Sequence, residues 1–104
     1  MTHTAISRNG VTIRLNDERW THIVEEHGEL SGMRAEVLQT ISNAERVMAG
    51  GAGELLAVRI VETSKALVVV YREANAAEGF IITAFLTKQL SRLNRRQQIW
   101  PSKT

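Results

Sequence analysis

The chain has 104 residues and a formal net charge of +2, a length typical of a single domain with one hydrophobic core. It contains no cysteine, which excludes disulfide bonds and thiolate metal sites. No apolar run approaches the roughly 20 residues that a membrane-spanning helix needs, and the N-terminus lacks the pattern of a signal peptide. We therefore expect one domain over residues 1–104, located in the cytoplasm and not associated with a membrane.

The charge is unevenly distributed along the chain. Five of the 13 Lys and Arg residues, and none of the 11 acidic residues, lie from Lys88 onward. Residues 1–87 consequently have a small excess of acids over bases. A basic C-terminal tail over residues 88–104 favours an anionic partner, with nucleic acid the first candidate. The alternative is a solvated polar segment that keeps the protein soluble.

The N-terminal half predicts one strand and two helices. Residues 1–9 are short and polar, and we expect them to be loose. Residues 11–15 alternate apolar and polar side chains, as a half-buried strand does. A first helix over residues 17–27 has Asn16 and Asp17 at its start and Gly28 after its end, which are favourable capping residues. A second helix is predicted over residues 33–42.

The C-terminal half predicts strands. Residues 46–49 are compatible with a brief strand, and the glycine-rich residues 50–53 are interpreted as a turn because no phosphate-binding motif follows them. Three strong strands are expected over residues 54–62, 66–72 and 79–87. Their short connections predict antiparallel neighbours, and their apolar residues on both faces predict a central or doubly covered position.

This order of elements predicts an α+β fold. We expect one or two N-terminal helices packed on a small twisted antiparallel sheet, followed by the basic tail. Within residues 88–98, Leu90 and Leu93 form a weak apolar edge that is compatible with a helix.

The first helix carries two histidines on different faces. At 100° per residue, Trp20, Ile23, Val24 and His27 share one stripe, whereas His22 points away from it. Their five-residue spacing is unsuited to binding one metal ion together. His27 is a candidate general acid or base because the pKa of histidine lies near neutrality. The alternative is a histidine at the edge of the core whose nitrogens are satisfied by backbone groups.

Other candidate site residues lie on the strands and after them. Arg59 lies in the middle of an apolar strand and needs a partner there; it is either an edge-facing side chain or a contact for an anion. Thr83 places a hydroxyl in an apolar strand, where threonine is also common for structural reasons. The candidate substrate-binding residues are Tyr71, Lys88, Arg92, Arg95 and Arg96.

These side chains favour a particular chemistry. The chain has one Asp and no His-Glu-x-x-His motif, so we expect neither a metal nor a cofactor. A histidine with cations and a hydroxyl would suit cleavage of a phosphodiester by the neighbouring 2′-hydroxyl. The histidine would exchange protons, and the cations would stabilise the charged phosphorane.

The segment from Trp20 to His27 reads W-x-H-I-x-x-x-H and is followed by GELLAVR ending at Arg59, LVVVYR, and FIITAF around Thr83. This pattern, over about residues 12 to 100, resembles the phage-associated nuclease-like proteins of the barnase–EndoU–colicin–RelE superfamily. The resemblance implies helices on a small antiparallel sheet and a metal-independent ribonuclease. It further implies acid and base roles for His27 and His22, a phosphate contact for Arg59 and a site hydroxyl for Thr83. The family often has proline where this chain has Gly28.

Three interpretations remain open from the sequence. The first is a toxin-type or phage-derived ribonuclease, whose partner besides RNA would be a cognate antitoxin or immunity protein. The second is a catalytically inactive domain of the same fold that binds RNA or protein. The third is a homodimer that uses Ile99 and Trp100 at its interface.

Overall fold

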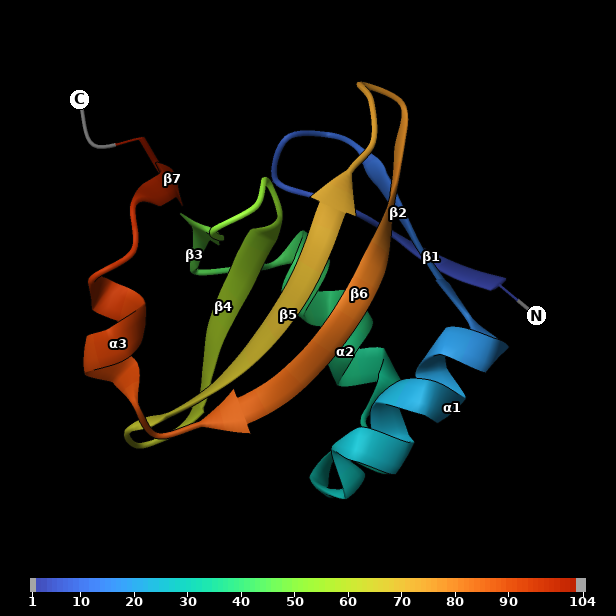
Figure 1. Cartoon of the computed structure of the whole chain (residues 1–104), viewed down its shortest axis with the longest axis horizontal. Coiled ribbons are helices and arrows are strands. Elements are labelled where there is room, and N and C mark those ends of the chain that lie inside the picture. The colour runs from blue at the N-terminus through green and yellow to red at the C-terminus, as the bar shows by residue number, and fades with distance from the viewer. Residues whose placement is uncertain (1, 103–104) are drawn as a thin grey trace.

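The structure, a computed structural model, describes residues 2–102 and contains one β-sheet with helices on both sides. The strands are β1 (Thr2–Ile6), β2 (Thr12–Asn16), β3 (Arg46–Ala49), β4 (Leu55–Glu62), β5 (Lys65–Glu73), β6 (Glu78–Thr87) and β7 (Gln98–Trp100). The helices are α1 (Asp17–Glu26), α2 (Arg34–Ser42) and α3 (Leu90–Asn94), with a short 3₁₀ helix η1 (Gly28–Leu30) between α1 and α2. Figure 1 shows their arrangement.

The sheet has seven strands in the order β1-β2-β6-β5-β4-β3-β7. β2 and β6 are parallel, and every other neighbouring pair is antiparallel. The α+β class is confirmed, but the expected small antiparallel sheet is wrong. The parallel pair arises because both helices and three strands separate β2 from β6 in the chain, and such a long connection permits a crossover.

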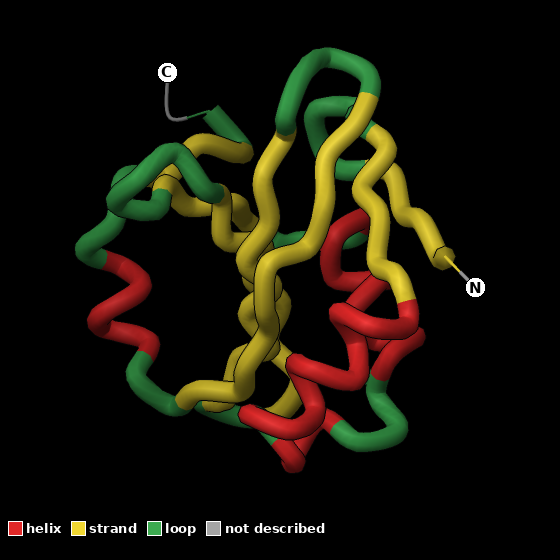
Figure 2. The backbone as a smooth tube through the Cα atoms, turned by 45° about the vertical axis from the view of Figure 1, so that its right-hand side comes forward, coloured by secondary structure: helices red, strands yellow, loops and turns green. Residues whose placement is uncertain are grey.

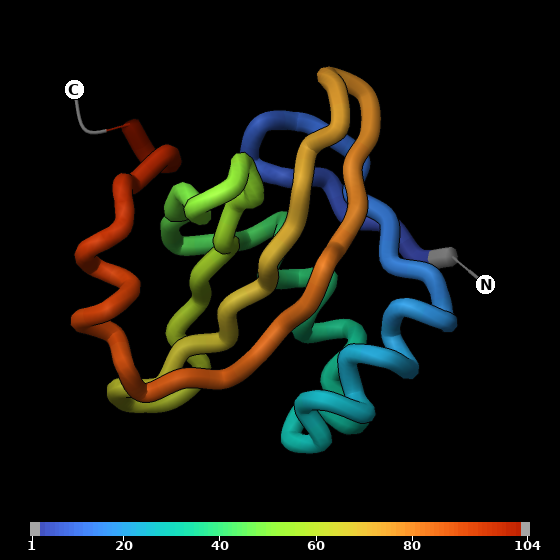
Figure 3. Tube along the Cα trace, in the orientation of Figure 1, coloured from blue at the N-terminus to red at the C-terminus, as the bar shows by residue number. Residues whose placement is uncertain are grey.

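Both ends of the described chain are part of the sheet. Residues 2–6, which were expected to be loose, form β1 and pair with β2. The turn between them contains Gly10 at a φ of +82°, a backbone conformation that favours glycine. Residues 88–102 form α3 and β7 instead of a separate tail, and β7 pairs with β3. Figure 3 follows this return of the chain from β6 through α3 to β7.

Helix α1 begins and ends close to its predicted limits. The Asn16 side chain accepts a hydrogen bond of 2.7 Å from the backbone N–H of Arg19, which confirms the predicted N-cap. The helix ends at Glu26, and the backbone N–H of His27 donates to the carbonyl of Ile23. Ile23 is buried, so the predicted apolar stripe does face the sheet.

The sheet lies between α3 on one side and α1 and α2 on the other (Figure 2), and an apolar core lies on each side. The helix-side core lies beneath α1 and α2, and its largest residues are Ile13, Leu15, Ile23, Leu30, Ile41, Leu67, Tyr71 and Ile81. The α3-side core contains Met48, Leu56, Val58, Ala66, Val68 and Leu93. Strands β4 and β5 contribute to both cores, which confirms the prediction that they are covered on both sides.

A β-bulge interrupts β6. Thr83 lies opposite Val70 and Ile81 lies opposite Tyr71, so Ile82 is an extra residue without a partner on β5. Because side chains alternate between the faces of a strand, the extra residue reverses the alternation. As a result, Phe80, Thr83 and Phe85 all lie on the α3 side of the sheet. No helix within residues 2–102 combines the length and the apolar character needed to cross a membrane.

Candidate functional site

His27 lies at the end of α1, beside the edge of β6. Within residues 2–102, β6 pairs with β2 only as far as Phe80, so the later part of β6 leaves this edge open to α1 and η1. The His27 side chain is 32% exposed, and its ring centroid lies 6.2 Å from that of Phe85. Its Nδ1 lies 3.6 Å from the Oε2 of Glu29, which is too long for a direct hydrogen bond. The imidazole therefore lies at the surface, beside the edge of β6. The neighbouring Phe85 ring belongs to the α3 side of the sheet.

His22 lies elsewhere on α1. Its side chain is 56% exposed, and its Nε2 lies 2.6 Å from the Oε1 of Glu26. His22 lines a pocket together with Asn16, Glu18, Arg19, Thr21 and Glu25. The carboxylates of Glu18 and Glu25 make this pocket unfavourable for a phosphate. The two predicted acid and base residues thus lie in different surroundings.

Arg59 is bound to helix α2. Its Nε donates to the Oγ1 of Thr40 over 3.1 Å, and its Nη2 donates to the carbonyl of Glu36 over 3.2 Å. Arg59 lies opposite Leu67, a residue of the helix-side core, so it shares that face of the sheet. Thr83 lies on the opposite face. The structure therefore does not bring Arg59 and Thr83 together in one cleft.

Tyr71 is part of the helix-side core and is only 1% exposed. Burial, and secondarily the nearby charge of Glu73, raises the pKa of its phenol above the usual value. The predicted contact between Tyr71 and a substrate is wrong for this structure. The prediction assumes that the end of a strand lies at the surface, whereas β5 is a central strand of the sheet.

A groove lies between α3 and the sheet, and we call it the α3 groove. It is lined by Leu56, Phe85, Thr87, Gln89, Arg92, Leu93, Arg95 and Arg96. None of these described residues is acidic. The groove thus brings together the three arginines that were predicted to bind substrate, while the fourth predicted cation, Lys88, is exposed beside it and does not line it.

The local sequence explains how the arginines are presented. Leu90 and Leu93 are one turn apart on α3 and pack on the α3-side core, which turns the other positions outward. The Nη1 of Arg92 donates to the Gln89 side chain over 3.0 Å, and that of Arg96 donates to the carbonyl of Ala49 over 3.3 Å. Within the described chain, the Arg95 side chain makes no hydrogen bond or ion pair. Each guanidinium therefore retains free donors, of which Arg95 has the most.

Phe85, Thr87 and Gln89 were not predicted as site residues. Phe85 belonged to the motif of the family resemblance, but its side-chain direction could not be inferred while the bulge at Ile82 was unknown. Residues 2–102 contain no group of three His, Cys, Asp or Glu side chains arranged to share a metal ion. No protein-family model, curated protein or solved structure matches the chain.

Proposed function

We propose that this protein binds RNA in the α3 groove. The observation that carries the proposal is the gathering of Arg92, Arg95 and Arg96 around one groove whose described lining has no acid. A guanidinium presents its N–H donors in a planar fork that matches two oxygens of a phosphate. Phe85 also lines the α3 groove. Aromatic rings beside basic residues are typical of surfaces that bind unpaired nucleic acid.

Metal-independent RNA cleavage is the second candidate function. It is favoured by the contact between His27 and Phe85, because that contact places an imidazole beside the α3 groove. His27 would accept the proton of the 2′-hydroxyl as its oxygen attacks phosphorus. The bond from phosphorus to the 5′-oxygen would break, the 5′-oxygen would take a proton from the imidazolium or from water, and the groove arginines would stabilise the charge that develops on the phosphorane. Thr83 lies on the same face, two residues before Phe85. The family resemblance supports the same reaction, although Arg59 and His22 take no part in this version of the site.

Binding is tested with a short fluorescently labelled RNA whose anisotropy is measured at several salt concentrations. We expect Arg92→Ala and Arg95→Ala each to weaken binding and to reduce the slope of log affinity against log salt by about 1. Arg19→Ala is the matched control, since it removes the same charge from α1 at the opposite side of the molecule (Figure 1). Equal losses in all three variants would show a nonspecific effect of net charge and contradict a groove.

Cleavage is tested with the same RNA in the presence of EDTA. We expect the wild type to leave a 2′,3′-cyclic phosphate, which is the product of attack by the 2′-hydroxyl. His27→Ala should abolish cleavage while retaining RNA affinity, and His22→Ala should retain both. If the wild type binds RNA but does not cut it, the protein is a binding domain and the catalytic role of His27 is wrong.

A further inference from the structure

The α3 side of the sheet continues beyond the α3 groove as an open surface with one exposed aromatic ring. Phe80 on β6 is 37% exposed. It lies opposite Arg72 on β5 and beside Arg14 on β2. Residues that are paired in this way across neighbouring strands share a face of the sheet. An aromatic side chain therefore lies between two arginines, and we call these three residues the Phe80 row.

The Phe80 row lies on the same face as the groove because of the bulge at Ile82. Phe80 and Phe85 are five residues apart, and in a regular strand that odd separation would place them on opposite faces. At about 3.3 Å per residue, the two rings are separated by roughly 15 Å along β6. A ligand that follows β6 can thus meet the Phe80 ring first and the groove afterwards.

A second observation links the row to the groove. Glu54 accepts a hydrogen bond of 2.7 Å from the backbone N–H of Ala52, and this bond is the main reason that the pKa of Glu54 is lowered. The charges of Arg72 and Arg96 lower the same pKa further. Arg72 of the row donates to the carbonyl of Ala52, and Arg96 of the groove donates to that of Ala49, so both arginines reach the loop over residues 49–54. Glu54 neutralises part of their charge there.

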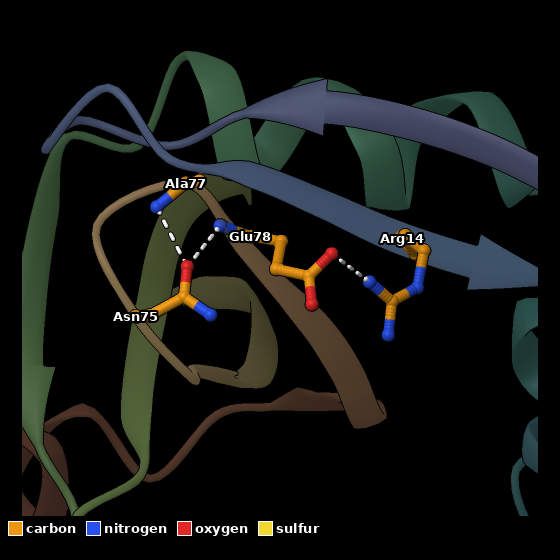
Figure 4. A network of polar contacts seen from close by, with 4 residues as sticks. All are labelled: Arg14, Asn75, Ala77 and Glu78. Atoms are coloured by element: carbon orange, nitrogen blue, oxygen red, sulfur yellow. Dashed lines mark hydrogen bonds and ion pairs between the residues drawn. The ribbon is translucent and has the colours of Figure 1, made fainter.

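Two contacts hold the arginines of the row in place. The Nη2 of Arg72 donates to the carbonyl of Ala52 over 2.9 Å, which leaves other guanidinium donors free. The Nη1 of Arg14 donates to the Oε2 of Glu78 over 3.1 Å, as Figure 4 shows. The Asn75 side chain accepts hydrogen bonds from the backbone N–H groups of Ala77 and Glu78, and so fixes the turn that presents Glu78. Glu78 neutralises part of the charge of Arg14.

We infer that Phe80 is a stacking site for an unpaired nucleobase and that Arg14 and Arg72 contact the phosphates beside that base. The inference rests on the proposed function, and it specifies single-stranded RNA as the ligand. In a duplex the base faces are stacked inside the helix and cannot lie on Phe80. A single strand can place one base on Phe80 and continue along β6 into the α3 groove.

The first experiment compares a labelled RNA of mixed sequence with the same RNA annealed to its complement. The wild type is expected to prefer the single strand. Phe80→Ala should weaken single-strand binding by about tenfold, as expected for the loss of one stacked base, and leave duplex binding unchanged. Phe80→Trp should retain the affinity. Ile99→Ala is the matched control, because Ile99 is equally exposed at 37%, and it should bind like the wild type.

The outcomes separate this inference from the proposed function. If Arg92→Ala weakens binding but Phe80→Ala does not, the α3 groove binds RNA and the stacking site is wrong. Equal affinity of the wild type for both forms of the RNA would likewise overturn the single-strand preference. Absence of any RNA binding would overturn both proposals.

A second variant tests Arg14 without removing it. Glu78→Gln removes the carboxylate that neutralises Arg14, so single-strand affinity should rise by roughly two- to threefold at low salt. The gain should shrink at high salt because the interaction is exposed to solvent. An unchanged or reduced affinity would show that Arg14 does not contact the RNA.

Discussion

Arg59 and Arg95 have the same guanidinium group in different surroundings. Arg59 is held by Thr40 and the carbonyl of Glu36, whereas Arg95 follows the end of α3 and lines the α3 groove. The rule that a mid-strand arginine needs a partner anticipated that Arg59 would be bound. It could not identify the partner, because Thr40 lies 19 residues away in the sequence and its position depends on how α2 packs.

Replacing Arg59 should therefore affect stability and not RNA binding. Arg59→Ala removes two hydrogen bonds to a charged group, so the free energy of unfolding should fall by about 1–3 kcal/mol. Urea denaturation followed by circular dichroism measures this change, and Arg95→Ala serves as a control that should leave stability nearly unaltered. If Arg59→Ala lost RNA affinity at full stability, Arg59 would be a phosphate contact after all.

Helix α3 is the element that shapes the groove, and it cannot form alone. Its five residues are far fewer than an isolated helix needs in water. It is held on the sheet by Leu93, which is 5% exposed, and by the partly buried Leu90. The positions of its arginines therefore depend on the packing of these leucines.

Loss of this packing should reduce stability and RNA affinity together. Leu93→Ala should lower the free energy of unfolding by about 2–4 kcal/mol, as for other buried leucines, and weaken RNA binding because Arg92 and Arg96 lose their fixed positions. Denaturation and anisotropy measured on the same sample test both effects. Ser91→Ala, an exposed change on the same helix, should alter neither. Undiminished affinity in Leu93→Ala would mean that the groove does not need α3 to be docked.

Elements with a strong periodic pattern could be predicted from the sequence. The apolar stripe and Asn16 cap identified α1, and the long apolar runs identified β4, β5 and β6. The short strands β1 and β7 were missed, because their pairing with distant segments stabilises them and their own sequences carry little pattern. The bulge at Ile82 was missed for the same reason: it is defined by the register between β5 and β6. The charge pattern alone predicted the arginines of the groove. Predicting that Phe85 lines the groove would have required the register between β5 and β6.

At the scale of the whole molecule, the two faces of the sheet differ. Helices α1 and α2 cover one face, and its core includes Tyr71. On the other face, α3 lies on the side of β3 and β4 (Figure 1). The larger of the two cores therefore lies on the helix side, and the proposed RNA surface lies on the more open side.

The stability of the fold should depend on pH through Tyr71 in the helix-side core. Its pKa is raised in the folded state, so the folded state holds the phenolic proton more tightly than the unfolded state does. The stabilisation is fully present below the unfolded pKa of about 10 and is lost as pH rises above it. Urea midpoints should fall more steeply above pH 10 in the wild type than in Tyr71→Phe.

The absorbance of tyrosinate provides a direct measurement, because Tyr71 is the only tyrosine in the chain. The signal should appear together with unfolding, as judged by circular dichroism. A phenol that ionises near pH 10 while the protein stays folded would show that Tyr71 is accessible to water, and the assignment of Tyr71 to the core would be wrong.

The bulge at Ile82 gives β6 one residue more than its pairing with β5 requires. Deleting Ile82 would leave Phe80 and Phe85 four residues apart, and a regular strand places residues at that even separation on the same face. Phe80 would still lie opposite Arg72, and Phe85 opposite Val68. A single-codon deletion would thus remove the bulge and leave both aromatic rings on the α3 side, so the surface depends on the register with β5 and not on the length of β6 alone.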